Sequence, residues 1–440
     1  MKVAFLTLGC KVNYYETEKM IADFRAHGFE VEDFKKNADI YIVNTCTVTN
    51  IADRKSRKML HRAKRNNPDS IVAAVGCYVE SGRDELEKDS AVDVFFSNAD
   101  KAEIVSKMIS YMEETGRQCP KIGADGMASA HMPPGGRTRK YIKVQDGCNQ
   151  FCSYCMIPYV RGGGILTSRE EGDVLEEVKR VAEHGFKEVV VTGIHLSSYG
   201  VDRSGAGSFV ETKGAPLVSL LQKVGAIPGI ERIRLGSLEP RIICDEFLEG
   251  LVQIDKLCPH FHLSLQSGCD ATLGRMNRHY TAAEYEMCCG RIREFFHNPA
   301  ITTDVIAGFP GETDEEFEMT RDFVKKIGLA DVHVFPYSVR NGTRAAGMEN
   351  QVPPEIRRRR AELLIQEAAR IREAYVTAFV GADERVLFEE IRNMDGEDFL
   401  VGHNERYVLL RVPISEAERR GFAENEIHTI SVETGNLIYE

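Results

Sequence analysis

The stretch "KYIKVQDGCNQFCSYC", residues 140–155, decides the fold of the central part of this 440-residue chain. Its first six residues, "KYIKVQ", combine aromatic and β-branched side chains with polar ones, a pattern typical of a β-strand. Cys148, Cys152 and Cys155 follow at once, with gaps of three and two residues. A closed tetrahedral metal site uses four protein ligands, so three clustered cysteines indicate a metal centre with one position left open.

Strand patterns recur six times from residue 140 onward, with helical patterns between them. The six are "KYIKVQ" (140–145), "EVVVTG" (188–193), "IERIRLGS" (230–237), "HFHLSLQ" (260–266), "ITTDVIAG" (301–308) and "DVHVFPY" (331–337). Repeated strand–helix units predict a TIM-like barrel, here a partial (β/α)6 barrel rather than one of eight units. The cysteine triplet directly follows the first strand, at the end of the barrel where active sites of such folds lie.

The first 116 residues also alternate strand and helix patterns, which predicts a separate α/β domain with a parallel sheet. Cys10, Cys46 and Cys77 each come just after a predicted strand, in "TLGCKVN", "VNTCTVT" and "AVGCYVE". The carboxyl ends of parallel strands form the ligand crevice of such a sheet, so these three thiols are expected to converge on one centre. Chance placement of three cysteines is the alternative.

Composition changes twice more along the chain. Residues 117–137 are rich in Gly, Pro and small side chains, which indicates a linker before a barrel domain at 138–377. A long charged helix from Glu355 to about Phe379 precedes four short strand patterns, so we expect a small β-barrel at 378–440. Small barrels of this kind often bind RNA, although a purely structural cap is the alternative.

Charge and cysteine usage limit the class of protein. The net charge of −11 argues against indiscriminate nucleic-acid binding, but "RKSRKMLHRAKR" (54–65) and "RRRR" (357–360) are local basic stretches. Each is either an RNA-binding surface or a solvated helix face. The chain shows no signal peptide and no membrane-spanning stretch, so we expect a cytoplasmic protein with reduced thiols. Six further cysteines show no ligand spacing and are expected to be inert: Cys119, Cys244, Cys258, Cys269, Cys288 and Cys289.

The C-x₃-C-x₂-C motif at the mouth of a barrel resembles that of the radical S-adenosylmethionine (SAM) superfamily. From end to end the chain resembles one family within it, the methylthiotransferases, which end in a small RNA-binding β-barrel called TRAM. The stretches "LGCKVNYYETE", "VTGIHLSSYG", "LGSLEP", "CPHFHLSLQSG" and "HVFPYSVRNGT" are most similar to the branch that modifies threonylcarbamoyladenosine in tRNA.

This resemblance implies two 4Fe-4S clusters, one on Cys10, Cys46 and Cys77 and one on Cys148, Cys152 and Cys155, with SAM chelated to the open iron of the second. It implies an enzyme that adds a methylthio group to carbon 2 of threonylcarbamoyladenosine beside the anticodon. Partners would be the tRNA anticodon stem-loop and an electron donor such as flavodoxin or ferredoxin, while the sulfur source stays unknown. Related branches act on isopentenyl-adenosine in tRNA or on an aspartate of a ribosomal protein. A zinc site, or an iron–sulfur RNA-binding sensor without turnover, are the alternatives outside the family.

The resemblance also implies SAM contacts, beyond which no catalytic residue is predicted: Tyr154, Gly193, Ser237, Glu239, Ser264 and Gln266. Arg278 is expected to pair with a carboxylate or an RNA phosphate, and "GFPGE" (308–312) to shape the SAM pocket. The chain departs from the family after Tyr159 and Arg161, where "GGGILTSR" (162–169) replaces a stretch rich in Arg and Ser. Only Arg169 remains there, which puts an RNA contact in doubt. Val339 stands where a proline is common.

Overall fold

The computed structural model describes residues 1–119 and 138–439, which form two compact units. The first unit holds residues 1–119, 147–165 and 338–346, and the second holds residues 138–146, 166–337 and 347–439. Most of the predicted linker, residues 120–137, lies outside the described residues. The loop with the second cysteine triplet therefore groups with the N-terminal residues, which its position in the sequence did not indicate.

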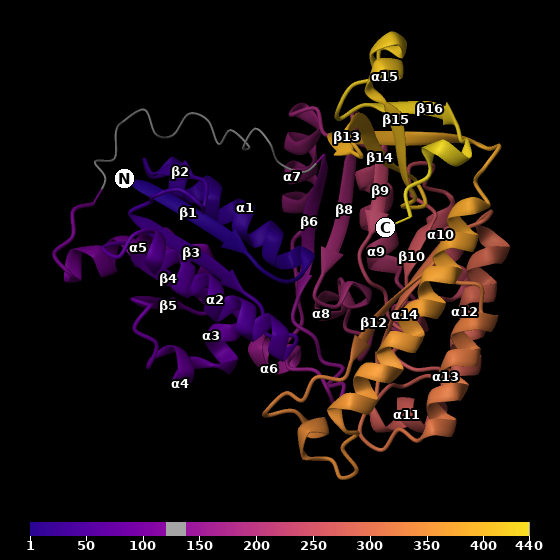
Figure 1. Cartoon of the computed structure of the whole chain (residues 1–440), viewed down its shortest axis with the longest axis horizontal. Helices are drawn as coiled ribbons and strands as arrows, with labels where there is room; N and C mark the ends of the chain where they lie inside the picture. Colours follow the sequence, from indigo (N-terminus) through magenta and orange to yellow (C-terminus); the bar gives the residue numbers. More distant parts are fainter. Residues whose placement is uncertain (120–137, 440) are drawn as a thin grey trace. The chain divides into compact units, whose positions relative to one another are not determined.

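The first unit contains a five-stranded parallel sheet in the order β2-β1-β3-β4-β5, as the alternating patterns predicted (Figure 1). The strands are β1 (Lys2–Thr7), β2 (Glu30–Glu32), β3 (Ile40–Thr45), β4 (Ile71–Gly76) and β5 (Val94–Phe96). The helices are α1 (Lys11–Ala26), α2 (Asn50–Asn66), α3 (Cys77–Ser81), α4 (Arg83–Leu86), α5 (Ile104–Glu114) and α6 (Ile157–Val160). β2 was not predicted, because three residues with two glutamates carry no apolar pattern.

Helices cover both faces of this sheet, which explains why β3 and β4 are buried throughout and mostly apolar. Met20 and Phe24 of α1 and Met108 of α5 pack against one face. Leu60 of α2 and Tyr78 of α3 pack against the other. A parallel sheet buried on both sides is the arrangement expected for continuous apolar strands.

The second unit contains six parallel strands, one for each predicted repeat. They are β6 (Arg139–Asp146), β8 (Glu188–Gly193), β9 (Arg232–Leu235), β10 (His260–His262), β11 (Ala300–Ala307) and β12 (Asp331–Pro336). A parallel bridge between Leu238 and Leu263 continues the order from β9 to β10. A two-residue strand, β7 (Thr167–Ser168), adds antiparallel to β6. The predicted partial (β/α)6 barrel is confirmed.

Helices alternate with these strands and cover the barrel, as Figure 1 shows for α9, α10, α12 and α13. The barrel helices are α7 (Glu171–Glu183), α8 (Val201–Ser204), α9 (Ala215–Gly225), α10 (Asp245–Val252), α11 (Asp270–Arg275), α12 (Ala282–Phe295), α13 (Asp314–Lys326) and α14 (Pro354–Thr377). Among the described helices, none is long and apolar enough to cross a membrane.

The C-terminal residues of the second unit form the predicted small β structure. Its antiparallel sheet has the order β15-β14-β13-β16, with a β-bulge between Phe388 and Glu390. The elements are β13 (Asp383–Met394), β14 (Glu397–Asn404), β15 (Leu409–Pro413), α15 (Ile414–Arg420) and β16 (Ile427–Ser431). Val386, Leu400 and Leu410 belong to a separate apolar core inside this sheet.

Buried arginines join the C-terminal sheet to the start of the barrel strands. Arg232 and Arg234, each 1% exposed, donate to the backbone carbonyls of Arg385, His403 and Glu405. Arg234 Nε also donates to Glu188 at 2.9 Å. Because these cations are buried only while the sheet covers them, the sheet and the barrel are expected to depend on each other for stability.

Candidate functional site

The N-terminal cysteines lie at the carboxyl ends of three neighbouring strands. Cys10 follows β1, Cys46 follows β3 and Cys77 follows β4, in the sheet order β1-β3-β4. Burial, together with the nearby thiols of Cys77 and Cys10, raises the pKa of Cys46 to about 11. The three cysteines therefore share one edge of the sheet, as expected, while their convergence on one centre stays a prediction.

Glycines before two of these cysteines let the turns approach each other. Gly9 and Gly76 have φ angles of +99° and +100°, a region that residues with a Cβ atom avoid. A Cβ atom on Gly9 would lie 2.7 Å from Cys46 Cβ, which is too close for any side chain. Backbone conformation and close packing thus explain why glycine precedes the cysteine in both "LGC" and "VGC".

Cys77 lies against a buried ionic network that the sequence did not reveal. Arg161 Nε donates to Cys77 Sγ at 3.4 Å, and its two terminal nitrogens bind both carboxylate oxygens of Glu16 at 2.9 Å. Asn13 Oδ1 accepts from the same guanidinium at 2.9 Å, and Lys101 Nζ donates to Glu16 at 2.5 Å. Arg161, Glu16 and Lys101 are at most 8% exposed. The network carries two cations and one anion next to the sulfur.

The second cysteine triplet lies in the loop after β6, where Cys148, Cys152 and Cys155 are all partly exposed. The Cys155 amide donates to the Cys152 carbonyl at 2.9 Å, which closes a tight turn. The Ser153 carbonyl accepts from the Ala345 amide at 2.7 Å, which ties this turn to the segment 338–346 of the same unit.

The triple glycine in "GGGILTSR" has a conformational cause. Gly162, Gly163 and Gly164 have φ angles of +77°, +61° and +91° in succession, which a run of L residues with side chains would not adopt. A Cβ atom on Gly164 would also lie 2.8 Å from the Phe151 ring. Phe151 and Tyr159 pack edge to face, and both rings are largely exposed.

The two cysteine triplets supply the kind of thiolate ligands that iron–sulfur clusters use. In residues 1–119 and 138–439, no three His, Cys, Asp or Glu side chains are grouped as ligands of one metal ion. Three thiols per group, without a fourth ligand, match a cluster with one open iron.

The residues predicted to contact SAM come to one end of the barrel. Gly193 ends β8, Ser237 and Glu239 follow β9, and Ser264 and Gln266 follow β10. The Ser264 amide donates to the Leu238 carbonyl, which links the ends of β9 and β10. Tyr154 lies in the cysteine loop and belongs to the other unit. The shared barrel edge is confirmed, while direct contact with SAM stays a prediction.

Packing, hydrogen bonds or backbone conformation also account for several of these residues. A Cβ atom on Gly193 would lie 3.0 Å from Gln145 Cβ, so glycine is needed there for strand packing. Glu239 is buried and accepts from the backbone and side chain of Arg241, with Arg278 at 4.0 Å. Gln266 has a φ angle of +69°, which is unusual for a residue with a side chain and is often found at functional sites.

His195 is a buried polar residue at this edge that the sequence analysis did not single out. Its Nδ1 atom lies 2.7 Å from Ser198 Oγ, and its buried Nε2 has no partner among the described residues. Burial, together with the cations of Arg278 and Arg241, lowers the pKa of His195 to about 3. The ring is therefore neutral at physiological pH.

Other sequence motifs have structural contacts of their own. Arg169 donates to the Lys143 carbonyl and pairs with Glu177 at 2.7 Å, so its charge is already matched. In "GFPGE", a Cβ atom on Gly308 would lie 2.3 Å from Arg357 Cγ, which makes this glycine a packing position against α14. Burial raises the pKa of Cys258 and of Cys289 to about 12, so these thiols stay protonated.

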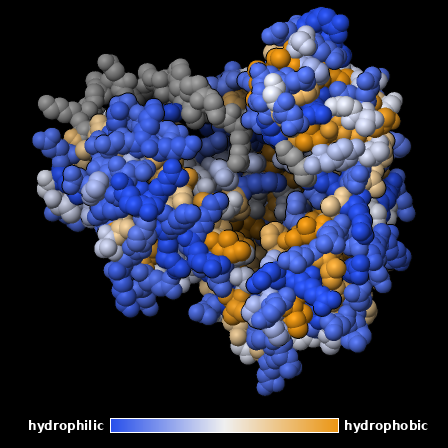
Figure 2. All heavy atoms as spheres, viewed as in Figure 1, coloured by the Kyte–Doolittle hydropathy of each residue, from blue (hydrophilic) through white to orange (hydrophobic). Residues whose placement is uncertain are grey.

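The two basic stretches differ in how much charge they leave available. In "RRRR", Arg360 is buried against Glu312 and Asp314, and Arg357 donates to the Tyr337 carbonyl. In α2, five cations have no hydrogen-bond or ion-pair partner in the described parts of the chain: Arg54, Lys55, Lys58, Arg62 and Arg65. Four of them, at positions 54, 58, 62 and 65, repeat with helical spacing on one face. The surface over α2 is strongly hydrophilic (Figure 2).

Comparison with known proteins agrees with this geometry. Residues 2–97 match the family described as "Uncharacterized protein family UPF0004", and residues 142–324 match the "Radical SAM superfamily". The chain is 37% identical to the "Threonylcarbamoyladenosine tRNA methylthiotransferase MtaB" of Bacillus subtilis (strain 168), over 92% of this chain and 89% of that protein. It is 33% identical to the "tRNA-2-methylthio-N(6)-dimethylallyladenosine synthase" of Acetivibrio thermocellus, over 89% of this chain and 82% of that protein.

A solved structure shows the same fold at low sequence identity. The radical S-adenosylmethionine methyltransferase TsrM from Kitasatospora setae aligns with a TM-score of 0.52 and 15% identity, over 77% of this chain and 74% of that one. A partial parallel barrel with three cysteines after its first strand defines a radical SAM enzyme. Within that class, the chain belongs to the methylthiotransferase family.

Proposed function

We propose that this enzyme adds a methylthio group to carbon 2 of threonylcarbamoyladenosine beside the anticodon of tRNA. The observation that carries the proposal is the pair of cysteine triplets, one at the carboxyl edge of the N-terminal sheet and one after the first barrel strand. Similarity to the Bacillus subtilis protein supports this acceptor. Carbon 2 of adenine carries no leaving group and is not acidic, so acid–base groups alone have little effect on it.

The cofactors of this reaction are SAM and two 4Fe-4S clusters. Cys10, Cys46 and Cys77 would hold one cluster, and Cys148, Cys152 and Cys155 the other. When bound, these groups supply the one-electron chemistry that the side chains lack. Tyr154, Gly193, Ser237, Glu239, Ser264 and Gln266 would orient SAM. We assign no catalytic residue beyond the six cysteines.

The buried network beside Cys77 suits a thiolate ligand. Arg161 and Lys101 exceed Glu16 by one positive charge, and the Arg161 guanidinium donates directly to Cys77 Sγ. Asn98 Nδ2 donates to the same sulfur at 3.6 Å. Hydrogen bonds and cations around a cluster sulfur stabilise its negative charge and tune the cluster potential. Arg161 is therefore assigned a positioning role.

tRNA would bind through phosphates to the unpaired face of α2 and to the C-terminal sheet, which we assign as a TRAM module. The corresponding domains are residues 1–116, 138–377 and 378–440, with a linker at 117–137. Such binding should weaken as salt rises, since it releases counterions. We further propose that the enzyme is cytoplasmic and takes electrons from a donor of the flavodoxin or ferredoxin type. The sulfur source is left unassigned.

Nucleoside analysis of tRNA from cells with and without the gene tests the proposal. Loss of the methylthio form of threonylcarbamoyladenosine on deletion is the expected result. Loss of the methylthio form of isopentenyl-adenosine instead, or of a modified ribosomal-protein aspartate, would transfer the enzyme to a related branch. If the purified, reconstituted protein forms no 5′-deoxyadenosine from SAM, the reading as a sensor without turnover gains support.

A further inference from the structure

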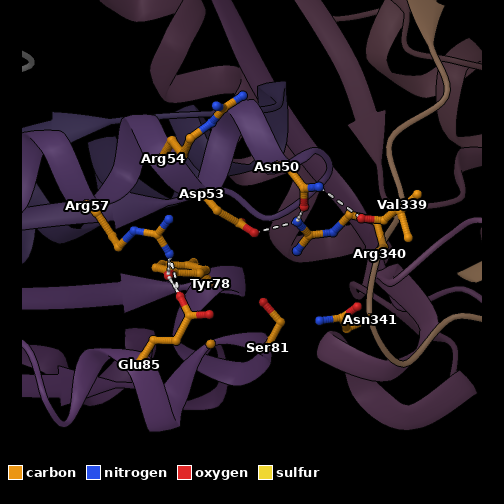
Figure 3. Close-up of a pocket in the computed structure, with 11 residues that line it drawn as sticks. Asn50, Asp53, Arg54, Arg57, Tyr78, Ser81, Glu85, Val339, Arg340 and Asn341 are labelled. Carbon is orange, nitrogen blue, oxygen red and sulfur yellow. Dashed lines mark hydrogen bonds and ion pairs between the residues drawn. The ribbon is translucent and has the colours of Figure 1, made fainter. Parts of the chain in front are cut away.

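A polar pocket of about 490 Å³ opens in the first unit next to two of the N-terminal cysteines. α2, α3, α4 and the segment 339–341 contribute its lining, and Figure 3 shows these side chains. Tyr78 in its lining directly follows Cys77. The Thr47 hydroxyl, directly after Cys46, accepts a hydrogen bond from Arg340, another lining residue.

The charged groups of the pocket leave one positive charge in excess. Arg340 pairs with Asp53 and also donates to Asn50 at 2.7 Å. Arg57 pairs with Glu85, and the hydroxyl of Tyr78 donates to the same carboxylate. Figure 3 shows both pairs facing into the space between the helices. The third arginine of the lining, Arg54, has no ion-pair partner in the described residues.

The lining also contains polar atoms whose hydrogen bonds are unmade. Arg340 is 6% exposed, yet its Nε donor has no partner among the described residues. Asp53 Oδ1, a buried acceptor, has none either. The side-chain amide of Asn341 makes no hydrogen bond within the described residues, and Figure 3 shows it facing Ser81. Buried polar groups without partners are uncommon in folded proteins, so these donors and acceptors indicate a polar ligand.

We propose that this pocket binds an anionic, hydrogen-bonding group of the tRNA substrate, an inference that rests on the proposed function. Two groups of that substrate share the required chemistry: the threonylcarbamoyl group, with its carboxylate, hydroxyl and urea, and a backbone phosphate. The volume lies within the range of pockets that hold small ligands. A site lined with such polar groups would reject an apolar base modification, since its own donors and acceptors would stay unpaired.

The test uses two substitutions of opposite electrostatic sign and one matched control, all in the full-length protein. Asn341→Asp adds a negative charge to the lining without changing its shape, and Glu85→Gln removes one. Asn37→Asp is the control, because Asn37 is an exposed loop residue that does not line the pocket. Dissociation constants are measured at one salt concentration for the same tRNA with and without the threonylcarbamoyl group. Thermal unfolding of each variant verifies that it is folded.

We expect Asn341→Asp to weaken binding about tenfold relative to Asn37→Asp, equivalent to about 1.4 kcal/mol. Glu85→Gln should tighten binding. An effect confined to the modified tRNA assigns the pocket to the threonylcarbamoyl group, and an equal effect on both tRNAs assigns it to a phosphate. If Asn341→Asp and Asn37→Asp bind both tRNAs alike, the pocket proposal is overturned. Methylthiolation by the wild-type enzyme is scored separately, so loss of the pocket proposal leaves the proposed function untouched.

Discussion

Replacing Glu16 should destabilise the first unit more than replacing either cation that it binds. Glu16 is the carboxylate that binds both Arg161 and Lys101 in the described residues, and all three side chains are buried. Glu16→Gln leaves two buried positive charges without a counter-charge, which costs about 3–5 kcal/mol in comparable networks. Burial already lowers the pKa of Lys101, and the neighbouring Arg161 cation lowers it further.

Replacing the cations leaves a balanced pair in each case. Arg161→Met keeps the Glu16–Lys101 pair but removes the hydrogen bonds to Asn13 and Cys77, so we expect a loss of about 2 kcal/mol. Lys101→Met keeps the bidentate Arg161–Glu16 pair and removes a poorly solvated ammonium, so we expect a change of about 0–1 kcal/mol. The expected order of destabilisation is therefore Glu16→Gln, then Arg161→Met, then Lys101→Met.

Native-state hydrogen exchange of the β1, β3 and β4 amides measures these differences without assuming that the two units unfold together. A loss of 3 kcal/mol corresponds to exchange more than a hundredfold faster. Lys107→Met, in a partly exposed pair with Asp100, is the surface control and should change exchange little. If Glu16→Gln accelerates exchange no more than Lys101→Met, charge balance does not govern this network and the reasoning is refuted.

Three further outcomes are expected. A chain ending at Thr377 uncovers Arg232 and Arg234, so its barrel should unfold at a lower temperature than in the full protein, and equal unfolding temperatures would contradict the buried joint. Because the pKa of His195 is lowered to about 3, the unfolded state binds more protons below pH 6.5 and stability should fall as pH drops from 6.5 towards 3. In urea unfolding at pH 5.5 this loss should reach about 1.4 kcal/mol in wild type and be absent in His195→Asn, and matching pH profiles would disprove it. Cys10→Ala should lower iron per chain by about half, and full iron retention would remove Cys10 from the ligand set.

The sequence by itself determined the architecture and the positions of the thiols. Strands and helices alternate with clear periodicity, so the parallel sheet, the six barrel strands and the C-terminal antiparallel strands could all be predicted. Because parallel strands bring their carboxyl ends to one edge, the placement of Cys10, Cys46 and Cys77 at that edge followed from local pattern alone. The same reasoning placed Gly193 and Gln266 at the barrel edge.

Only the tertiary structure decided which charged side chains have ion-pair partners and which do not. The run at 357–360 and the stretch at 54–65 look alike in sequence, yet Arg360 is buried on Glu312 while Arg54 has no ion-pair partner in the described residues. Arg161 reaches Glu16 across 145 positions, and Arg340 reaches Asp53 across 287. Such ion pairs depend on which distant segments of the chain lie next to each other in the fold. Hydrophobic periodicity does not encode this. Periodicity reports which face of an element is buried, whereas the partner of a buried charge is set by packing between distant segments.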